Sequence, residues 1–173
     1  VLTEKDYFNG SNEDLLEAKN SINLPLLRKD FMLDPIQIYE SKMLGADCVL
    51  LIVSALSQST YKQLFELASK LDLDVLTEVH DIYELDFALS QNAKLIGINN
   101  RNLKSFDVDI NTSIDLARTI NDNDIVLVSE SGISSSSDII TLNSSGIYTF
   151  LVGEHLIKSN NITNELGVLI NGE

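Results

Sequence analysis

The chain has 173 residues, 44% hydrophobic and 22% charged, a composition that suits one globular domain and excludes disorder as the default state. Its net charge of −14 argues against general nucleic-acid binding, which needs a basic face. The one cysteine, Cys48, excludes a disulfide framework and a CxxC metal site, and we interpret it as a small core residue.

The sequence carries no sign of membrane insertion or export. Its longest apolar stretch, 48–53, is too short to span a bilayer, and no signal peptide is present. We therefore expect a soluble, cytoplasmic protein without a membrane partner. Because the chain opens with Val1 rather than Met, and its first residues resemble the end of a strand, we expect the true N-terminus to be missing.

The predicted elements alternate between strand and helix along the whole chain. Strands are predicted at 1–4, 24–27, 47–53, 72–80, 93–99, 124–130 and 146–152. Helices, with their capping residues, are predicted at 11–19, 34–44, 58–71, 81–91, 112–120, 134–142 and 163–170, with a short helical turn at 155–157. This alternation, without a hairpin signal, predicts a parallel α/β sheet.

Local signals are clearest for the helix after Asp34. Asp34 is a good N-cap, Pro35 suits the first helical position, and Gly45 suits the end of the helix. The helix is predicted to bury an apolar stripe made of Ile36, Ile38, Tyr39 and Met43.

The strand count favours one architecture. A doubly wound sheet usually carries a glycine-rich phosphate loop, which is not evident, so a (β/α)8 TIM barrel of the phosphate-binding type fits better. Such barrels typically have about 250 residues. We therefore predict an incomplete barrel that lacks the first βα unit and most of strand 2. Residues 1–173 would form a single domain, the C-terminal seven-strand portion of the barrel.

Polar residues and glycines cluster where the predicted strands end. They are Lys29; Glu78; Asn99 with Arg101; Glu130 with Ser131 and Gly132; and Gly153. The carboxyl ends of barrel strands form the active-site face, so we predict that these residues share a site. Two alternatives stay open: a solvated Arg-Lys-Asp turn at 28–30, and a helix N-terminal carboxylate for Glu78.

Two kinds of chemistry fit these residues. Ser131-Gly132 and Gly153-Glu154 each precede a helical segment, where backbone amides bind phosphate, although single glycines are also typical of plain turns. A lysine and a carboxylate at one face, here Lys29 and Glu78, transfer protons in opposite directions. No metal-ligand spacing, GxSxG or Walker sequence is present, and we interpret His80 and His155 as capping or surface residues.

Several motifs together resemble one family. They are VLTEKDYFNGS, LPLLRKDF, GADCVLLI, LTEVHD, LIGINNRNL, VSESGI and FLVGEHL, and they resemble indole-3-glycerol phosphate synthase of tryptophan biosynthesis. The resemblance implies a carboxy-lyase that closes the indole ring of 1-(2-carboxyphenylamino)-1-deoxyribulose 5-phosphate, releasing carbon dioxide and water. It implies a phosphorylated small-molecule substrate and neither cofactor nor metal. Association or fusion with other tryptophan-pathway enzymes is left open.

The resemblance also implies roles for individual residues. Lys29 resembles the general acid that helps the sugar carbonyl accept attack, and Glu78 the general base of the dehydration. Asn99 resembles a residue that orients the substrate, with Arg101 in charge support. The implied catalytic set is Lys29, Glu78, Asn99, Arg101, Glu130 and Ser131. The implied phosphate-binding amides are those of Gly132, Gly153 and Glu154. The implied apolar wall for the anthranilate ring is Phe8, Phe31 and Leu50.

The chain departs from the family at its N-terminus. The family's first strand carries a lysine, a glutamate just before it and a Ser-Pro-Ser phosphate loop, and a helical extension precedes that strand. None of these is in this sequence. We therefore expect the activity from the complete gene product and little or none from these residues alone. The alternatives are another phosphate-binding barrel, such as a phosphoribosyl isomerase, against which RKDF and TEVH argue, and a non-catalytic truncated remnant that at most binds phosphate ligands.

Overall fold

A computed structural model describes residues 1–103 and 105–171, and the chain divides into two compact units. Unit 1 comprises Val1–Glu78 and Gln91–Leu95, and unit 2 comprises Val79–Ser90 and Ile96–Glu173. Each unit contains parallel strands that alternate with helices, as the sequence pattern predicts. The single domain over 1–173 stays a prediction.

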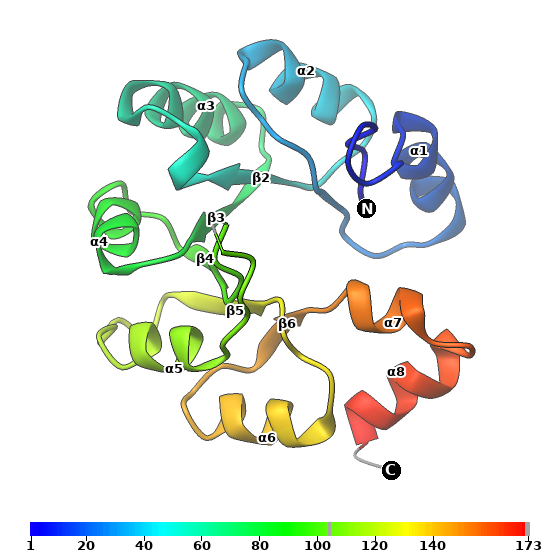
Figure 1. Ribbon diagram of the computed structural model, residues 1–173. Helices are drawn as coiled ribbons and strands as arrows, with labels where there is room; N and C mark the ends of the chain where they lie inside the picture. The colour runs from blue at the N-terminus through cyan, green and yellow to red at the C-terminus, as the bar shows by residue number, and fades with distance from the viewer. Residues whose placement is uncertain (104, 172–173) are drawn as a thin grey trace. The chain divides into compact units, whose positions relative to one another are not determined.

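Unit 1 contains three strands in sequential order, and the first two are each followed by a helical segment of the same unit. The strands are β1 (Leu27–Arg28), β2 (Cys48–Ile52) and β3 (Asp74–Val79), and the helices are α1 (Asn12–Ser21), α2 (Pro35–Met43), the short 3-10 helix η1 (Val53–Ala55) and α3 (Gln58–Lys70). β2 pairs in parallel with both neighbours, and its last residue, Ile52, lies opposite Glu78. Helix α3 packs on β2 and α2 (Figure 1).

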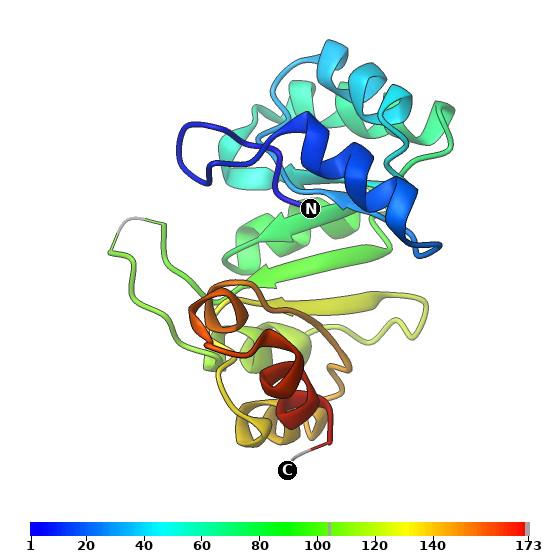
Figure 2. The ribbon, with the colours of Figure 1, turned by 90° about the vertical axis from the view of Figure 1, so that its right-hand side faces the viewer.

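Unit 2 repeats the same pattern. Its strands are β4 (Leu95–Asn99, in this unit from Ile96), β5 (Val126–Glu130) and β6 (Thr149–Leu151), and its helices are α4 (Ile82–Ser90), α5 (Asn111–Ala117), α6 (Ser136–Asn143), α7 (Glu154–Lys158) and α8 (Ile162–Asn171). β5 and β6 are parallel, with Glu130 opposite Leu151. Helix α8 packs against α6 and α7 (Figure 2). A buried cluster of this unit comprises residues of α5, of α6 and of the loops on either side of α6, namely Ile114, Ala117, Ile133, Leu142 and Ile147.

The helix-start signals are confirmed. The Ser11 hydroxyl accepts a hydrogen bond from the Asp14 amide at 3.2 Å. Asp34 accepts from Ile36, the Gln37 side chain accepts from the Asp34 amide, and Pro35 is the first helical residue. Each cap satisfies an amide that lacks a partner inside its helix.

The predicted apolar stripe of α2 is wrong in three of its four residues. Ile38 is fully buried, but Ile36, Tyr39 and Met43 are 67%, 47% and 86% exposed. The buried face of the helix instead contains Ser41, which accepts a hydrogen bond from Arg28. The inward face of α2 therefore includes a hydrogen-bond partner for Arg28 of β1. The spacing of apolar residues within the helix could not predict this contact.

Every predicted strand is shorter in the structure, and three of them are shortened most in proportion to their predicted length. The ladder of β1 begins at Leu27, and Leu24 is 67% exposed, because Pro25 has no amide to donate and the amide of Leu26 bonds to the Asp47 carboxylate. The strand predicted at 1–4 is reduced to one parallel bridge, between Leu2 and Lys29. β6 begins only at Thr149, because Ile147 and the residue before it close the end of α6 by hydrogen bonds to helix carbonyls.

A buried hydroxyl pair between α3 and β3 provides a stability prediction. Tyr61 and Thr77 are both fully buried, their hydroxyl oxygens lie 2.7 Å apart, and burial raises the pKa of Tyr61 to about 12. Tyr61→Phe takes the phenol hydroxyl away from Thr77 and is expected to lower the free energy of unfolding by about 1–3 kcal/mol in urea denaturation. The exposed Tyr39→Phe is the control and should stay within about 0.5 kcal/mol. Equal effects of the two variants would contradict the prediction.

Candidate active site

The strand ends of unit 1 bring together the two residues predicted to transfer protons. The Lys29 Nζ lies 3.6 Å from the Glu78 Oε2, which is within ion-pair distance. Glu78 lies inside β3 rather than at a helix start, so the alternative of a helix N-terminal carboxylate is wrong. Its side chain is 2% exposed, whereas that of Lys29 is 27% exposed. The pair thus combines a buried carboxylate with an ammonium that solvent or a ligand can reach.

The backbone of Lys29 is held on one side by the N-terminal segment. Its amide donates to the Val1 carbonyl at 2.8 Å, and its carbonyl accepts from the Thr3 amide at 3.2 Å. Successive residues of an extended strand point to opposite faces, so Lys29 faces Glu78 while Arg28 faces the helices. This alternation explains why neighbouring cations have different surroundings.

Arg28 is a buried anchor rather than part of a solvated turn. Its side chain is 4% exposed and donates to the Glu40 carboxylate at 2.8 Å and to the Asp30 carboxylate at 3.5 Å. Its remaining side-chain donors reach the side chains of Thr3, Asn12 and Ser41 and the carbonyl of Gln37. The prediction of a solvated turn at 28–30 is therefore wrong for Arg28. The guanidinium ties α1, α2 and the N-terminal segment to the strand that presents Lys29.

The residues predicted to form the apolar wall are also in unit 1. Leu50 is 2% exposed in β2, while Phe8 and Phe31 are 53% and 38% exposed. The Glu4 carboxylate accepts the amides of Asp6, Tyr7 and Phe8 and so shapes the turn that carries Phe8. Desolvation raises the pKa of Glu4, but these three hydrogen bonds together lower it below its ordinary value. Contact of the three apolar residues with an anthranilate ring stays a prediction.

The structure connects Arg101 with a residue predicted for phosphate binding. Asn99 accepts the Arg101 amide at 3.0 Å, and the Arg101 guanidinium lies 2.6 Å from the Glu154 carboxylate. Lys158 lies 2.6 Å from the same carboxylate. The hydrogen bond and charge of Lys158, followed by the charge of Arg101, lower the pKa of Glu154. The Glu154 side chain thus forms ion pairs with two cations. The group of Glu154 that is predicted to bind the phosphate is its backbone amide.

The end of β5 has a strained turn. Glu130 is 1% exposed, and the two following residues, Ser131 and Gly132, have φ angles of 66° and 79°. A Cβ on Gly132 would lie 2.5 Å from the Val108 Cγ1, so Gly132 is required both by its backbone angle and by space. Gly153 differs, because its φ is −122° and no described heavy atom lies within 4 Å of a Cβ built there.

The two amides directly before α6 are already bonded within the protein. Asp138 accepts the amides of Ser134 and Ser135, each at 2.9 Å, and also both hydroxyl groups. Burial raises the pKa of Asp138, but the hydrogen bonds from the two serines lower it further than burial raises it. The helix begins at Ser136, and the amides of Ser134 and Ser135 are engaged by Asp138 rather than offered to an anion.

Sequence reasoning missed a buried polar cluster beside these strand ends. It comprises Asn100, Ser113 and Ser129, which are 3%, 0% and 0% exposed. A signal was present, since Ser129 interrupts an apolar strand run and Asn100 follows another strand. Neither signal indicates which residues would form hydrogen bonds with the Ser129 hydroxyl or with the Asn100 side-chain amide.

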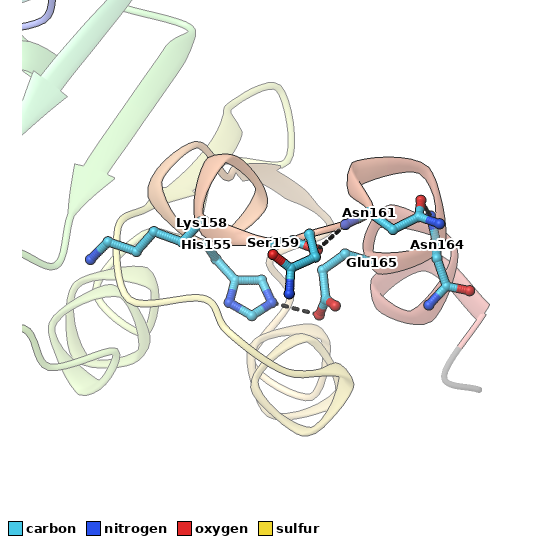
Figure 3. Close-up of a pocket in the computed structure, with 7 residues that line it drawn as sticks. His155, Lys158, Ser159, Asn161, Asn164 and Glu165 are labelled. Carbon is cyan, nitrogen blue, oxygen red and sulfur yellow. Dashed lines mark hydrogen bonds and ion pairs between the residues drawn. The ribbon is translucent and has the colours of Figure 1, made fainter.

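A shallow polar groove of about 420 Å³ lies between α7 and α8 (Figure 3). Its lining is His155, Lys158, Ser159, Asn160, Asn161, Asn164 and Glu165. The His155 Nε2 lies 2.7 Å from the Glu165 Oε1, so this histidine joins the two helices. The other histidine, His80, bonds Glu84 of α4 at 3.0 Å, which fits its interpretation as a capping residue.

In the part of the chain that the structure describes, no helix is both long and apolar enough to cross a membrane.

Comparison with known proteins identifies close sequence relatives. A family model described as indole-3-glycerol phosphate synthase matches residues 1–169. The indole-3-glycerol phosphate synthase of Delftia acidovorans is 50% identical over 159 residues, which are 92% of this chain and 59% of that protein. The enzyme of the same name from Chlorobium chlorochromatii is 48% identical over 170 residues, 98% of this chain and 64% of that protein. The chain thus spans about three fifths of the length of the curated relatives it matches.

Comparison with solved structures confirms the fold class. The 3-keto-L-gulonate-6-phosphate decarboxylase of Vibrio cholerae matches with a TM-score of 0.72 at 16% identity, over 98% of this chain and 83% of that chain. A structure described as native KDPGal matches with a TM-score of 0.71 at 12% identity, over 99% of this chain and 79% of that one. At such low identity the likeness shows the fold alone, which is that of a TIM barrel.

Proposed function

The chain belongs to the indole-3-glycerol phosphate synthase family, and we propose that the protein closes an indole ring by decarboxylation and dehydration of 1-(2-carboxyphenylamino)-1-deoxyribulose 5-phosphate. The observation that carries the proposal is the Lys29–Glu78 pair, with 3.6 Å between its nearest charged atoms at the strand ends of unit 1. A partly exposed ammonium beside a buried carboxylate fits a mechanism with one general acid and one general base.

In the proposed mechanism, Lys29 acts first. Its ammonium donates a proton to the ketone oxygen of the sugar as the aromatic carbon attacks, so that negative charge does not accumulate on that oxygen. Loss of carbon dioxide restores the aromatic ring. Glu78 then accepts a proton from the former sugar carbon bonded to the ring nitrogen, and the hydroxyl group on the neighbouring carbon takes a second proton from Lys29, reprotonated by solvent, and leaves as water. The distance of 3.6 Å between the two side chains supports this division of roles, because one small substrate could contact both of them.

Unit 2 supplies the groups proposed to hold the phosphate. We assign the phosphate to the amides of Gly132, Gly153 and Glu154, because backbone N–H groups at a turn bind anions without a charged side chain. The steric requirement for glycine at position 132 supports this assignment, whereas the open surroundings of Gly153 neither require nor exclude it. Asn99 and Arg101 are proposed to orient the substrate, and Glu130 and Ser131 to line the site.

The reaction is tested by indole fluorescence in two proteins. One is the 173-residue chain, and the other is a chimera in which the aligned 170 residues of the C. chlorochromatii relative are replaced by this chain. We expect the chimera to convert the substrate and to release carbon dioxide, and the chain alone to show little or no turnover. A folded chimera without turnover, measured beside an active relative, would contradict the proposed reaction. That result would favour the alternative in which the chain is non-catalytic and at most binds phosphate ligands.

A further inference from the structure

The buried side chain of Asn100 connects three segments of unit 2. Its Nδ2 donates to the Ser129 hydroxyl at 2.9 Å and to the Ser131 carbonyl at 3.0 Å. Its Oδ1 accepts the amide and the hydroxyl of Ser113 at 3.0 and 2.8 Å. Both donors and the acceptor are therefore engaged, which is the condition for a buried amide to be rigid rather than destabilising.

The backbone of Asn100 strengthens the connection to the end of β5. Its amide donates to the Glu130 carbonyl at 2.8 Å, directly before the strained turn. The side chain then reaches past this peptide to the carbonyl of Ser131. Ser131 has a φ of 66°, a left-handed conformation that is costly for a residue with a Cβ and persists only where surrounding groups hold it. Asn100 is the side chain that bonds this carbonyl.

Through the peptide bond between Ser131 and Gly132, the contact of Asn100 with the Ser131 carbonyl also orients the Gly132 amide. A trans peptide is planar, and its C=O and N–H point in opposite directions. Fixing the direction of the Ser131 carbonyl therefore fixes the direction of the Gly132 N–H. The Val108 methyl group lies 2.5 Å from the position of an added Cβ, so a larger residue at position 132 would displace this peptide or Val108.

We propose that Asn100 is a positioning residue for the phosphate of the ligand, and that it acts by orienting the Gly132 amide. This inference rests on the proposed function, in which that amide binds the phosphate. Asn100 itself touches no ligand. It keeps one N–H group aimed outward from the end of β5 by holding the carbonyl of the same peptide inward.

The test measures phosphate binding and the Gly132 amide in the full 173-residue chain. Inorganic phosphate is titrated into ¹⁵N-labelled protein while the ¹H–¹⁵N signals are followed. Asn100→Ala is expected to shift the Gly132 signal and to weaken phosphate binding about tenfold, the effect of one misplaced hydrogen bond. Ser129→Ala removes one partner of Asn100 but leaves its bond to the Ser131 carbonyl, and should change binding less than about twofold. The exposed Asn121→Ala is the control.

The outcomes separate this inference from the reaction. Equal loss of phosphate binding in Asn100→Ala and Ser129→Ala would indicate general loosening of the cluster and overturn the positioning role, as would unchanged binding in Asn100→Ala. If Asn100→Ala does not fold, Asn100→Ser takes its place with the same expectations. Absence of phosphate binding in the wild-type chain overturns the inference together with the phosphate assignment. Phosphate binding without turnover in the chimera overturns the proposed reaction alone.

Discussion

Replacing Lys29 by methionine in the chimera is expected to slow indole formation by about 10²–10⁴-fold, the range that a general acid contributes. Methionine keeps the length of the side chain but has no proton to donate to the ketone oxygen. Because the Lys29 ammonium lies 3.6 Å from Glu78, the substitution also leaves the carboxylate without this cation. The measurement is the increase of indole fluorescence at saturating substrate, so that a loss in kcat is separated from a change in KM.

Two further variants sharpen this experiment. Glu78→Gln keeps the shape of the buried side chain and should reduce kcat to a similar extent. The double variant should be little slower than either single one, since residues that act as a unit are not additive. The control is Lys19→Met, which removes an exposed ion pair with Asp47 and should leave the rate within about twofold. An undiminished rate in Lys29→Met would remove this lysine from the mechanism.

Arg28→Met is expected to cause the largest loss of stability, about 3–5 kcal/mol of the free energy of unfolding. The guanidinium is 4% exposed and bonds Glu40 and Asp30, together with uncharged side chains of α1, α2 and the N-terminal segment. Methionine fills much of the volume but leaves these carboxylates and hydroxyl groups facing an apolar side chain. In a chain of this size the loss corresponds to a fall in Tm of roughly 10 °C.

Thermal unfolding followed by circular dichroism measures this effect. Lys19→Met again serves as the control, because both members of its ion pair with Asp47 are 40% exposed and such pairs contribute about 0–1 kcal/mol. A fall in Tm no larger than that of the control would mean that the Arg28 contacts contribute little to stability.

The sequence allowed the proximity of Lys29 and Glu78 to be predicted, but not the buried polar contacts that surround the strand ends. Their proximity could be predicted because a buried parallel strand is an apolar run that ends where polar residues begin. A parallel sheet brings the ends of consecutive strands to one face. Their buried polar neighbours in the chain could not be interpreted in this way. These neighbours are Arg28 beside Lys29 and Thr77 beside Glu78, and Ser129 beside Glu130 and Asn100 beside Asn99 have the same place in unit 2. Their partners come from distant helices, such as Ser41, Tyr61 and Ser113, so no local pattern predicts them.

The two glycines of the predicted phosphate site show a similar limit. Gly132 and Gly153 look alike in the sequence, since each follows a strand and precedes a helical segment. The structure gives Gly132 a positive φ and a close neighbour, Val108, while Gly153 has neither. The difference depends on where the loop that contains Val108 returns, and the hydrogen bond of the Asp109 amide with the Asn100 carbonyl and the bridge between Arg101 and Val108 hold that loop.

The central claim is that Lys29 and Glu78 serve the same substrate, and a crystal structure of the chimera with bound indole-3-glycerol phosphate tests it most directly. The account predicts that the Lys29 Nζ and a Glu78 carboxylate oxygen each lie within hydrogen-bonding distance of the ligand's indole or glycerol portion. A ligand bound where neither side chain reaches it, in a crystal that still turns over substrate, would contradict the account.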